Sequence, residues 1–283
     1  MTYDITKTLF LSDMDGTLLT PGAVLSETAA RELRRMIGQG LRFSIATGRI
    51  KESVREILGG ILPLPVPLVL LNGTLVYDSA SGQLVKKEQM AAHTVREVLR
   101  LAREHRQNGF LYTLEDDAIR PYYREPLRPV MRAFMRDRWK VYGGFVPLED
   151  WNALADADVV YFTVQDSYGA LEPLYRDLKE LPELDCALYR DIYHEGNWFL
   201  ECFSCRASKY NAACWLRETF GFTRVVGFGD NHNDLPLFAA CDESYAVANA
   251  PEEIRAAATG VIGANTEDGV VRFLRERTLL GSS

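Results

Sequence analysis

The sequence predicts an α/β protein with a Rossmann-like parallel sheet, helices on both of its faces, and a second α/β module inserted into it. Three observations predict this. Strand and helix patterns alternate over the first eighty residues, change to longer helices and less buried strands from about residue 83, and alternate again after about residue 198. The core is therefore expected to be discontinuous, with residues 1–82 and 196–283 forming it and residues 83–195 forming an α/β cap.

The first eighty residues hold three apolar strand patterns separated by two helix patterns. Ser26 is placed to cap the first helix, and Gly38 and Gly40 are signals that end it. A strand–helix–strand–helix–strand order implies parallel strands with helices on both faces. The expected elements are a strand at 8–12, a helix from Ser26 to about Ile37, a strand at 41–46, a helix at 49–58 and a strand at 66–71.

The insert and the second half of the core follow in the same chain order. Tyrosine and arginine are frequent in the insert, as at Tyr122, Tyr123 and Arg124. Helices are expected at 95–105 and 129–139 and strands at 159–164 and 198–203. The returning core is expected to have helices at 209–219, 235–240 and 269–277 and strands at 224–228 and 244–247.

Length and composition narrow the class of protein. The 283 residues fit one large domain or two modest ones, and 47% apolar with 25% charged residues is the balance of a soluble globular protein. A net charge of -7 argues against a main role in coating nucleic acid or an anionic membrane. The longest apolar stretch, Ile61–Leu71, contains three prolines and is too short to span a membrane. Five cysteines without a secretory signal predict reduced thiols in the cytoplasm.

Polar residues gather where the expected core strands end. The first strand is followed by Asp13-Met14-Asp15-Gly16-Thr17, and the second by Thr47-Gly48-Arg49. The strand at 224–228 is followed by Gly229-Asp230-Asn231-His232-Asn233-Asp234. Ligands of parallel α/β sheets bind at the carboxyl ends of the strands, so these three segments are expected to form one site.

The charges of these segments predict a metal. Asp13, Asp15, Asp230 and Asp234 would place up to four carboxylates in one crevice, and such charges raise one another's pKa unless a cation intervenes. Lys209 is the best protein cation, at the start of its helix. The expected ligands are all oxygen, with no cluster of His or Cys, so Mg²⁺ is the expected ion.

The same residues suit a phosphate ester of a small molecule. Thr47 and Gly48 are expected to open a helix whose free N–H groups favour an anion, and Lys209 adds positive charge. Asp13 could attack phosphorus as a covalent nucleophile. Asp15 could protonate the leaving oxygen and later deprotonate the attacking water.

The motifs DMDGTLL, TGR, a lone Lys and GDNHND, in that order, resemble the four motifs of the haloacid dehalogenase (HAD) superfamily. Asn72-Gly73, Ala248-Asn249-Ala250 and the run from Asn265 to Gly269 look like its Cof-type branch. That branch carries a type IIB α/β cap between the second and third motifs, where the insert falls. The resemblance covers essentially the whole chain.

The resemblance implies a role for each residue that matches a motif. Asp13 looks like the nucleophile and a metal ligand, and Asp15 like the general acid/base, with its backbone carbonyl on the metal. The other implied roles are metal ligation by Asp230, support by Asp234, phosphate contacts by Thr47, Lys209 and Asn233, and phosphate-facing N–H groups at Met14 and Gly48. The chain departs from the family's pattern at two positions. Asn231 stands where the family often has Gly or Ser, and Tyr210 stands where it commonly has Gly.

Three other features receive no catalytic role. Cys202-x-x-Cys205 has no second pair and no properly spaced His, which favours a structural role. Gly227-x-Gly229 lacks the third glycine of a dinucleotide fingerprint, because that position is His232. His232 lies within the fourth motif without an assigned function.

The function predicted is a magnesium-dependent phosphatase of small phosphorylated metabolites, with sugar phosphates favoured, and with no nucleic acid or membrane partner. A phosphomutase of the same superfamily would share the chemistry. A phosphoacceptor module or a binding protein without turnover belongs to a different class. The cap is expected to close over the core and select the leaving group. The sequence predicts neither the substrate, nor the cap residues that select it, nor the oligomeric state.

Overall fold

The computed structural model describes residues 3–154, 156–191 and 196–278, and its chain divides into two compact units. The first unit is Met1–Lys87 with Ser208–Ser283, and the second is Glu88–Ala207. The expected boundaries were at 83 and 195, whereas this division falls at 88 and 207. The chain therefore enters and leaves the second unit once.

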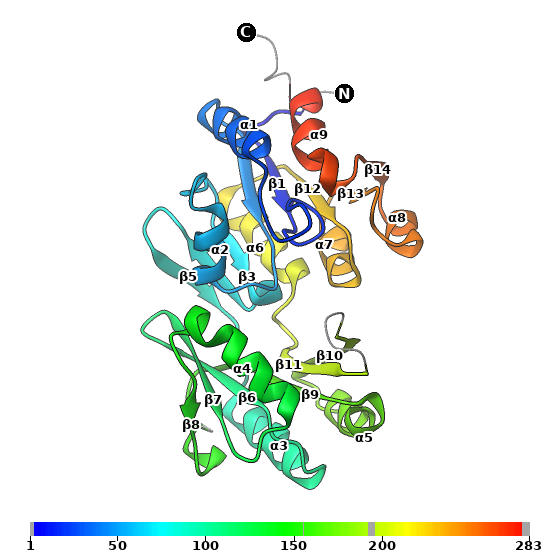
Figure 1. Cartoon of the computed structure of the whole chain (residues 1–283). Helices are drawn as coiled ribbons and strands as arrows, with labels where there is room; N and C mark the ends of the chain where they lie inside the picture. The colour runs from blue at the N-terminus through cyan, green and yellow to red at the C-terminus, as the bar shows by residue number, and fades with distance from the viewer. Residues whose placement is uncertain (1–2, 155, 192–195, 279–283) are drawn as a thin grey trace. The chain divides into compact units, whose positions relative to one another are not determined.

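The centre of the first unit is a parallel sheet with the strand order β14-β13-β12-β1-β2 (Figure 1). Every residue of β1 is buried, because β1 lies between β12 and β2. Ser12 at the end of β1 stands opposite Phe228 on β12 and Ile45 on β2, so the three strands end at the same edge. The strands are β1 Thr8–Ser12, β2 Arg42–Ile45, β12 Arg224–Gly229, β13 Glu243–Val247 and β14 Gly260–Ile262.

The strand expected as the third parallel strand pairs mainly in the antiparallel direction. It is β3, Leu68–Leu70, and a single parallel bridge from Val69 to Ala46 connects it to the chain beyond β2. Its ladder is antiparallel with β4, Leu75–Asp78, which pairs in turn with β5, Gln83–Lys87. This hairpin was not expected from the sequence.

Helices cover both faces of the first sheet. Leu9 and Leu11 of β1 share an apolar cluster with Leu216 of α6 and Leu237 of α7. Phe273 of α9 packs edge-on against Phe228, on the other side of the sheet. The helices are α1 Glu27–Gly38, α2 Lys51–Leu58, α6 Lys209–Phe220, α7 Leu235–Ala240, α8 Glu252–Ala257 and α9 Gly269–Arg277, with short 3₁₀ turns η1 Leu71–Gly73, η3 His232–Asp234 and η4 Asn265–Glu267.

Two helix starts test the local signals. Ser26 caps α1 as expected, since its hydroxyl accepts a hydrogen bond from the Ala29 N–H at 3.0 Å. The helix expected from Arg49 begins instead at Lys51, after Ile50. Thr47 and Gly48 therefore lie in the loop before α2 and not in its first turn, and that prediction was wrong.

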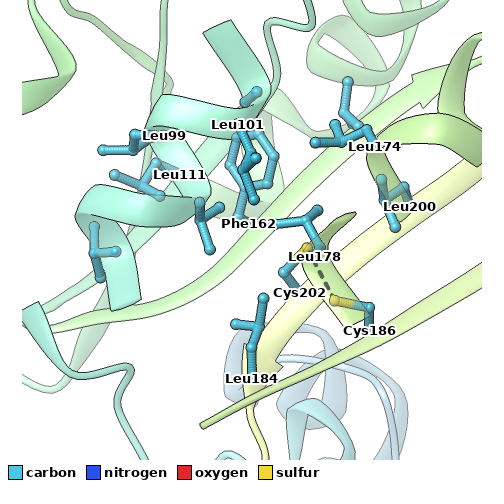
Figure 2. Close-up of a cluster of buried hydrophobic side chains, with 14 of the residues drawn as sticks. Leu99, Leu101, Leu111, Phe162, Leu174, Leu178, Leu184, Cys186, Leu200 and Cys202 are labelled. Carbon is cyan, nitrogen blue, oxygen red and sulfur yellow. Dashed lines mark hydrogen bonds between the residues drawn. The ribbon is translucent and has the colours of Figure 1, made fainter. Parts of the chain in front are cut away.

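The second unit is a six-stranded sheet with the order β10-β11-β9-β6-β7-β8, antiparallel except between β7 and β8. Figure 2 shows the apolar cluster in which Leu99 of α3 and Leu174 of α5 join Phe162 and Leu200 of the sheet. The elements are α3 Ala92–Glu104, β6 Phe110–Glu115, β7 Ala118–Tyr123, α4 Pro129–Tyr142, β8 Val146–Pro147, η2 Trp151–Leu154, β9 Val159–Asp166, α5 Tyr168–Lys179, β10 Leu184–Arg190 and β11 Trp198–Ser204.

Strand β11 explains why the division falls later than expected. The strand expected at 198–203 was assigned to the core, which was expected to resume at residue 196, but Cys202 pairs with Cys186 of β10 and with Phe162 of β9. Both ladders lie in the second unit. Among the helices that the structure describes, none is long and apolar enough to cross a membrane.

Candidate active site

The candidate site begins where β1 and β12 end. Asp13 directly follows β1, and its N–H donates to the Phe228 carbonyl of β12 at 2.9 Å. Asp230 directly follows β12. Position 16 requires glycine for two reasons. Its φ is +79°, and a Cβ there would lie 2.4 Å from Asp230 Oδ2. The DMDGT segment therefore packs directly against the fourth motif.

A buried ammonium group connects two of the carboxylates. Lys209 Nζ donates to Asp13 Oδ1 and to Asp234 Oδ1, each at 2.6 Å. The Lys209 side chain has no exposed surface. It is held in place because Ser208 caps α6, accepting from the Asn211 N–H at 3.0 Å. The lysine is thus fixed between the first and fourth motifs.

Burial and charge oppose each other in this triad. Burial raises the pKa of Asp13 well above its usual range, although Lys209 acts in the opposite direction. Burial alone would lower the pKa of Lys209, but the adjacent Asp13 and Asp234 carboxylates outweigh it and raise that pKa. The ammonium is therefore charged at neutral pH.

The fourth motif is organised around Asp234. Its Oδ2 accepts hydrogen bonds from the N–H groups of Asp230 at 2.9 Å and Asn231 at 3.1 Å, while Oδ1 is bound by Lys209. Both oxygens of Asp234 are therefore already engaged. Asp230 instead accepts from the Thr17 hydroxyl at 2.7 Å through Oδ1, and burial raises the pKa of Asp230 to about 6.

These carboxylates fit a divalent metal. One oxygen each from Asp13, Asp230 and Asp234 lies within 4.8 Å of the others. Three carboxylates against one ammonium leave negative charge that a divalent cation would neutralise, and oxygen is the donor that hard cations prefer. Because Asp234 is held by Lys209 and two N–H groups, Asp13 and Asp230 are the better candidates for ligands.

Asp15 points to a partner that sequence reasoning did not assign. Arg49 binds both of its oxygens, with Nε to Oδ2 and Nη2 to Oδ1 at 2.6 Å each, a bidentate pair. Arg49 also donates from Nη1 to the Ser53 hydroxyl at 2.7 Å. The Asp15 side chain is 51% exposed, unlike that of Asp13. The arginine of the TGR motif was the sequence feature from which this partner of Asp15 could have been predicted.

Thr47 and Gly48 lie beside a second loop. Thr47 is buried, and its hydroxyl accepts from the Arg49 N–H at 3.2 Å, which leaves the hydroxyl hydrogen free to be donated. Asn233 Nδ2 donates to Asn72 Oδ1 at 3.3 Å, and a Cβ on Gly48 would lie 3.4 Å from Asn72 Nδ2. Asn72 thus connects segments that the sequence analysis treated separately.

Of the remaining positions singled out in the sequence, Met14 is buried, and Tyr210 and His232 lie on the surface. Met14 is fully buried, and its carbonyl accepts from the N–H groups of Leu18 and Leu19. That the N–H groups of Met14 and Gly48 face phosphate stays a prediction. Tyr210 is exposed, and His232 pairs with Glu253 at 2.9 Å on the surface.

The two cysteines of Cys202-x-x-Cys205 do not face each other. Cys202 is buried with its sulfur 3.7 Å from that of Cys186, whereas Cys205 is exposed. This supports the structural role expected for Cys202. Cys202 and Cys205 do not form one site together, although the spacing of their motif could have suggested it.

A family model described as haloacid dehalogenase-like hydrolase matches residues 10–274. The chain therefore belongs to the haloacid dehalogenase-like hydrolases. The match spans both units, including the whole insert.

Several named relatives of this chain are phosphatases. Pyridoxal phosphate phosphatase YbhA of Escherichia coli (strain K12) is 24% identical over 280 residues, covering 95% of this chain and 98% of its own. The 5-amino-6-(5-phospho-D-ribitylamino)uracil phosphatase YcsE of Bacillus subtilis (strain 168) is 24% identical over 280 residues, covering 98% of each. A solved HAD subclass IIB sugar phosphatase shares the fold, with a TM-score of 0.72 at 19% identity over 96% of this chain and 98% of that one.

These comparisons confirm the resemblance, the α/β fold class and the expected class of enzyme, a HAD-type hydrolase. Hydrolases of this family generally use a divalent metal, and the aspartate cluster could hold one. The identity of that metal and the roles of individual residues stay predictions.

Proposed function

We propose that the chain is a Mg²⁺-dependent phosphatase that hydrolyses a small phosphorylated metabolite, with sugar phosphates as the favoured class, through an aspartyl-phosphate on Asp13. The observation that carries this proposal is the buried Asp13–Lys209–Asp234 triad beside Asp230, at the carboxyl ends of β1 and β12. The phosphatase names of the relatives and the sugar phosphatase fold support it.

The first half-reaction transfers the phosphoryl group to the protein. A carboxylate oxygen of Asp13 attacks phosphorus, the bond to the leaving oxygen breaks, and Asp15 gives that oxygen a proton. Lys209 holds the Asp13 carboxylate in one orientation, so the nucleophile is positioned before substrate arrives. Thr47, with its hydroxyl hydrogen available, and Lys209 would bind phosphate oxygens.

The second half-reaction restores Asp13. Asp15, now a carboxylate, removes a proton from water, the water oxygen bonds to phosphorus, and the bond from phosphorus to Asp13 breaks to release inorganic phosphate. Arg49 holds both oxygens of Asp15 but leaves each of them a further lone pair, so the pair can persist while Asp15 takes up the proton. Arg49 therefore acts through Asp15 as a positioning residue.

Asp13 and Asp230, with the Asp15 carbonyl, would hold Mg²⁺, while Asp234 supports the site through Lys209 and the N–H groups of the fourth motif. The metal would neutralise the charge repulsion between the Asp13 carboxylate and the phosphate. Asn233, whose amide donates to Asn72, would contact the phosphate as well. The second unit would select the leaving group.

Phosphate release from a panel of sugar, nucleotide and cofactor phosphates, measured with Mg²⁺ and with EDTA, tests the proposal. We expect release that depends on the metal and is lost in Asp13→Asn. Asp4→Asn is the matched control, because Asp4 is an exposed turn residue whose carboxylate accepts hydrogen bonds from Thr6, outside the candidate site. Isomerised sugar phosphate without free phosphate would instead indicate a phosphomutase, and stable labelling of Asp13 would indicate a phosphoacceptor.

A further inference from the structure

Two asparagines that take no part in the proposed chemistry follow the outer strands of the first sheet. Asn249 lies just after β13, and Asn265 begins the η4 turn after β14. Because β12, β13 and β14 are parallel neighbours, they end at the same edge of the sheet as β1. Both asparagines can therefore reach the loop after β1, which carries Asp13 and Asp15.

The loop at residues 14–19, named the Asp15 loop, folds tightly on itself. The Met14 carbonyl accepts from the N–H groups of Leu18 at 3.0 Å and Leu19 at 2.9 Å. Asp15 pairs with Leu19 in an isolated β-bridge, and the Leu19 side chain is fully buried. The place from which the Asp15 side chain starts is therefore determined by the backbone of this loop.

The two asparagines bind the backbone of the Asp15 loop at two points. Asn249 Nδ2 donates to the Gly16 carbonyl at 2.8 Å, and Asn265 Nδ2 donates to the Leu19 carbonyl at 2.8 Å. The asparagines are also joined to each other, because the Asn265 N–H donates to Asn249 Oδ1 at 2.9 Å. A continuous set of hydrogen bonds thus connects the loop to the ends of β13 and β14.

A side-chain amide suits both positions. Asn249 donates to one carbonyl and accepts from one N–H, whereas a carboxylate has no hydrogen to donate. Asn265 is buried, so a carboxylate there would face the Leu19 carbonyl oxygen and leave two acceptors without a hydrogen between them. The contacts with the loop therefore account for the residue type at each position.

The turn that carries Asn265 is itself fixed. The Gly269 N–H donates to the Ala264 carbonyl at 3.1 Å, and a Cβ on Gly269 would collide with neighbouring backbone. The Ser26 hydroxyl donates to Asp268 Oδ1 at 2.8 Å and connects the turn to the start of α1. Asn265 is thus presented to the loop from a closed and anchored turn.

We infer that Asn249 and Asn265 are positioning residues for Asp15, the proposed general acid/base. They hold the Asp15 loop at Gly16, the residue after Asp15, and at Leu19, the residue paired with it. The Asp15 carboxyl group therefore meets the leaving oxygen from a fixed position. This inference rests on the proposed function, because it concerns the acid of that same reaction.

Single-turnover release of the leaving group, measured on the full chain with Mg²⁺, tests this inference. The two substrates are the sugar phosphate of the panel that is hydrolysed fastest and 4-nitrophenyl phosphate. In Asn249→Ala and Asn265→Ala, release from the sugar phosphate should slow by about 10–10²-fold, because a displaced acid protonates the leaving oxygen poorly. Release of 4-nitrophenolate needs no proton and should slow by less than about twofold. Asn249 is exposed, so its variant keeps the test available if Asn265→Ala does not fold.

Asn108→Ala is the matched control, because Asn108 Nδ2 also donates to a backbone carbonyl, that of Pro126 at 3.1 Å, but within the second unit. It should change neither rate. Amide hydrogen exchange without substrate gives a second readout that does not depend on activity. We expect faster exchange at residues 14–19 in Asn249→Ala and Asn265→Ala, and unchanged exchange there in Asn108→Ala.

Equal slowing of both substrates in the Asn249 and Asn265 variants, while Asp15→Asn still distinguishes the substrates, would overturn the inference by showing a structural role only. Unchanged rates, or unchanged exchange at residues 14–19, would overturn it as well. If Asp15→Asn itself slows both substrates equally, the acid role of Asp15 is wrong, so the proposed function fails and the inference falls with it.

Discussion

The two units bury charge in opposite ways. In the first unit, Asp13 and Asp234 share the ammonium group of Lys209 as their counter-charge. In the second unit, Glu201 has tyrosine hydroxyls as partners. Opposite charges keep ionised groups ionised inside a protein, whereas neutral donors only partly replace water. The first arrangement suits covalent chemistry on a carboxylate.

The largest effect is expected from removing the cation of the first unit, the ammonium group of Lys209. Lys209→Met keeps most of the side-chain volume but leaves two buried carboxylates without a counter-charge. We expect the free energy of unfolding to fall by about 3–5 kcal/mol and phosphate release to be lost. Urea unfolding of both proteins measures the change.

Lys179→Met is the control for that substitution. Lys179 pairs with Asp185 at 3.0 Å on the exposed surface of the second unit, so its loss should cost no more than about 1 kcal/mol. Equal losses at the two lysines would contradict the importance given to burial of the triad.

The acid role of Asp15 should depend on the leaving group. In a single turnover, Asp15→Asn is expected to slow release of the leaving group by about 10²–10⁴-fold for a sugar phosphate, and by much less for 4-nitrophenyl phosphate, whose leaving group needs no proton. Arg49→Ala should show the same dependence with a smaller loss, because Arg49 acts through Asp15. Arg55→Ala, at an exposed position of the following helix α2, should change neither rate. Equal effects of Arg49→Ala on both substrates would indicate a structural role only.

Two glutamates of the second unit should respond to pH with opposite signs. The pKa of Glu201 is raised by burial, so its contribution to stability is present below the ordinary carboxyl pKa and is lost as pH rises through the folded-state pKa. Burial would also raise the pKa of Glu115, but hydrogen bonds from Tyr122 and Thr113 and the charge of Arg120 lower it. Its contribution is present above the ordinary carboxyl pKa and is lost as pH falls.

Urea unfolding at a series of pH values between about 3 and 8 checks this pair. Relative to wild type, Glu201→Gln should gain stability as pH rises, and Glu115→Gln should lose it. The same trend in both variants would contradict the opposite pKa shifts given to the two glutamates.

The smallest expected effect compares helix caps in the two units. Ser26→Ala removes a hydroxyl that accepts from the Ala29 N–H and donates to Asp268, and should cost about 1 kcal/mol of unfolding free energy. Ser167 also precedes a helix, but its side chain makes no capping hydrogen bond. Ser167→Ala should therefore change stability little, and an equal cost at both serines would contradict this account of the caps.

Much of the first unit could be predicted because its signals are local. Apolar runs, the Ser26 cap and the strand-end motifs predicted the strands β1, β2 and β12 and helices α1 and α6 to within a few residues. The second unit was harder, because antiparallel strands such as β7 and β10 are only partly buried. Their apolar patterns are correspondingly weak.

By itself, the sequence determined the family, the α/β class and the residues that carry the proposed chemistry, because those residues occur in ordered motifs at strand ends. Only the tertiary structure decided which residues these side chains bind. Arg49 binds Asp15 across 34 residues, and Lys209 reaches Asp13 across 196. Strand β11 belongs to the second unit because its ladders are with β10 and β9. Such pairings depend on three-dimensional proximity, which residue type and local spacing do not encode.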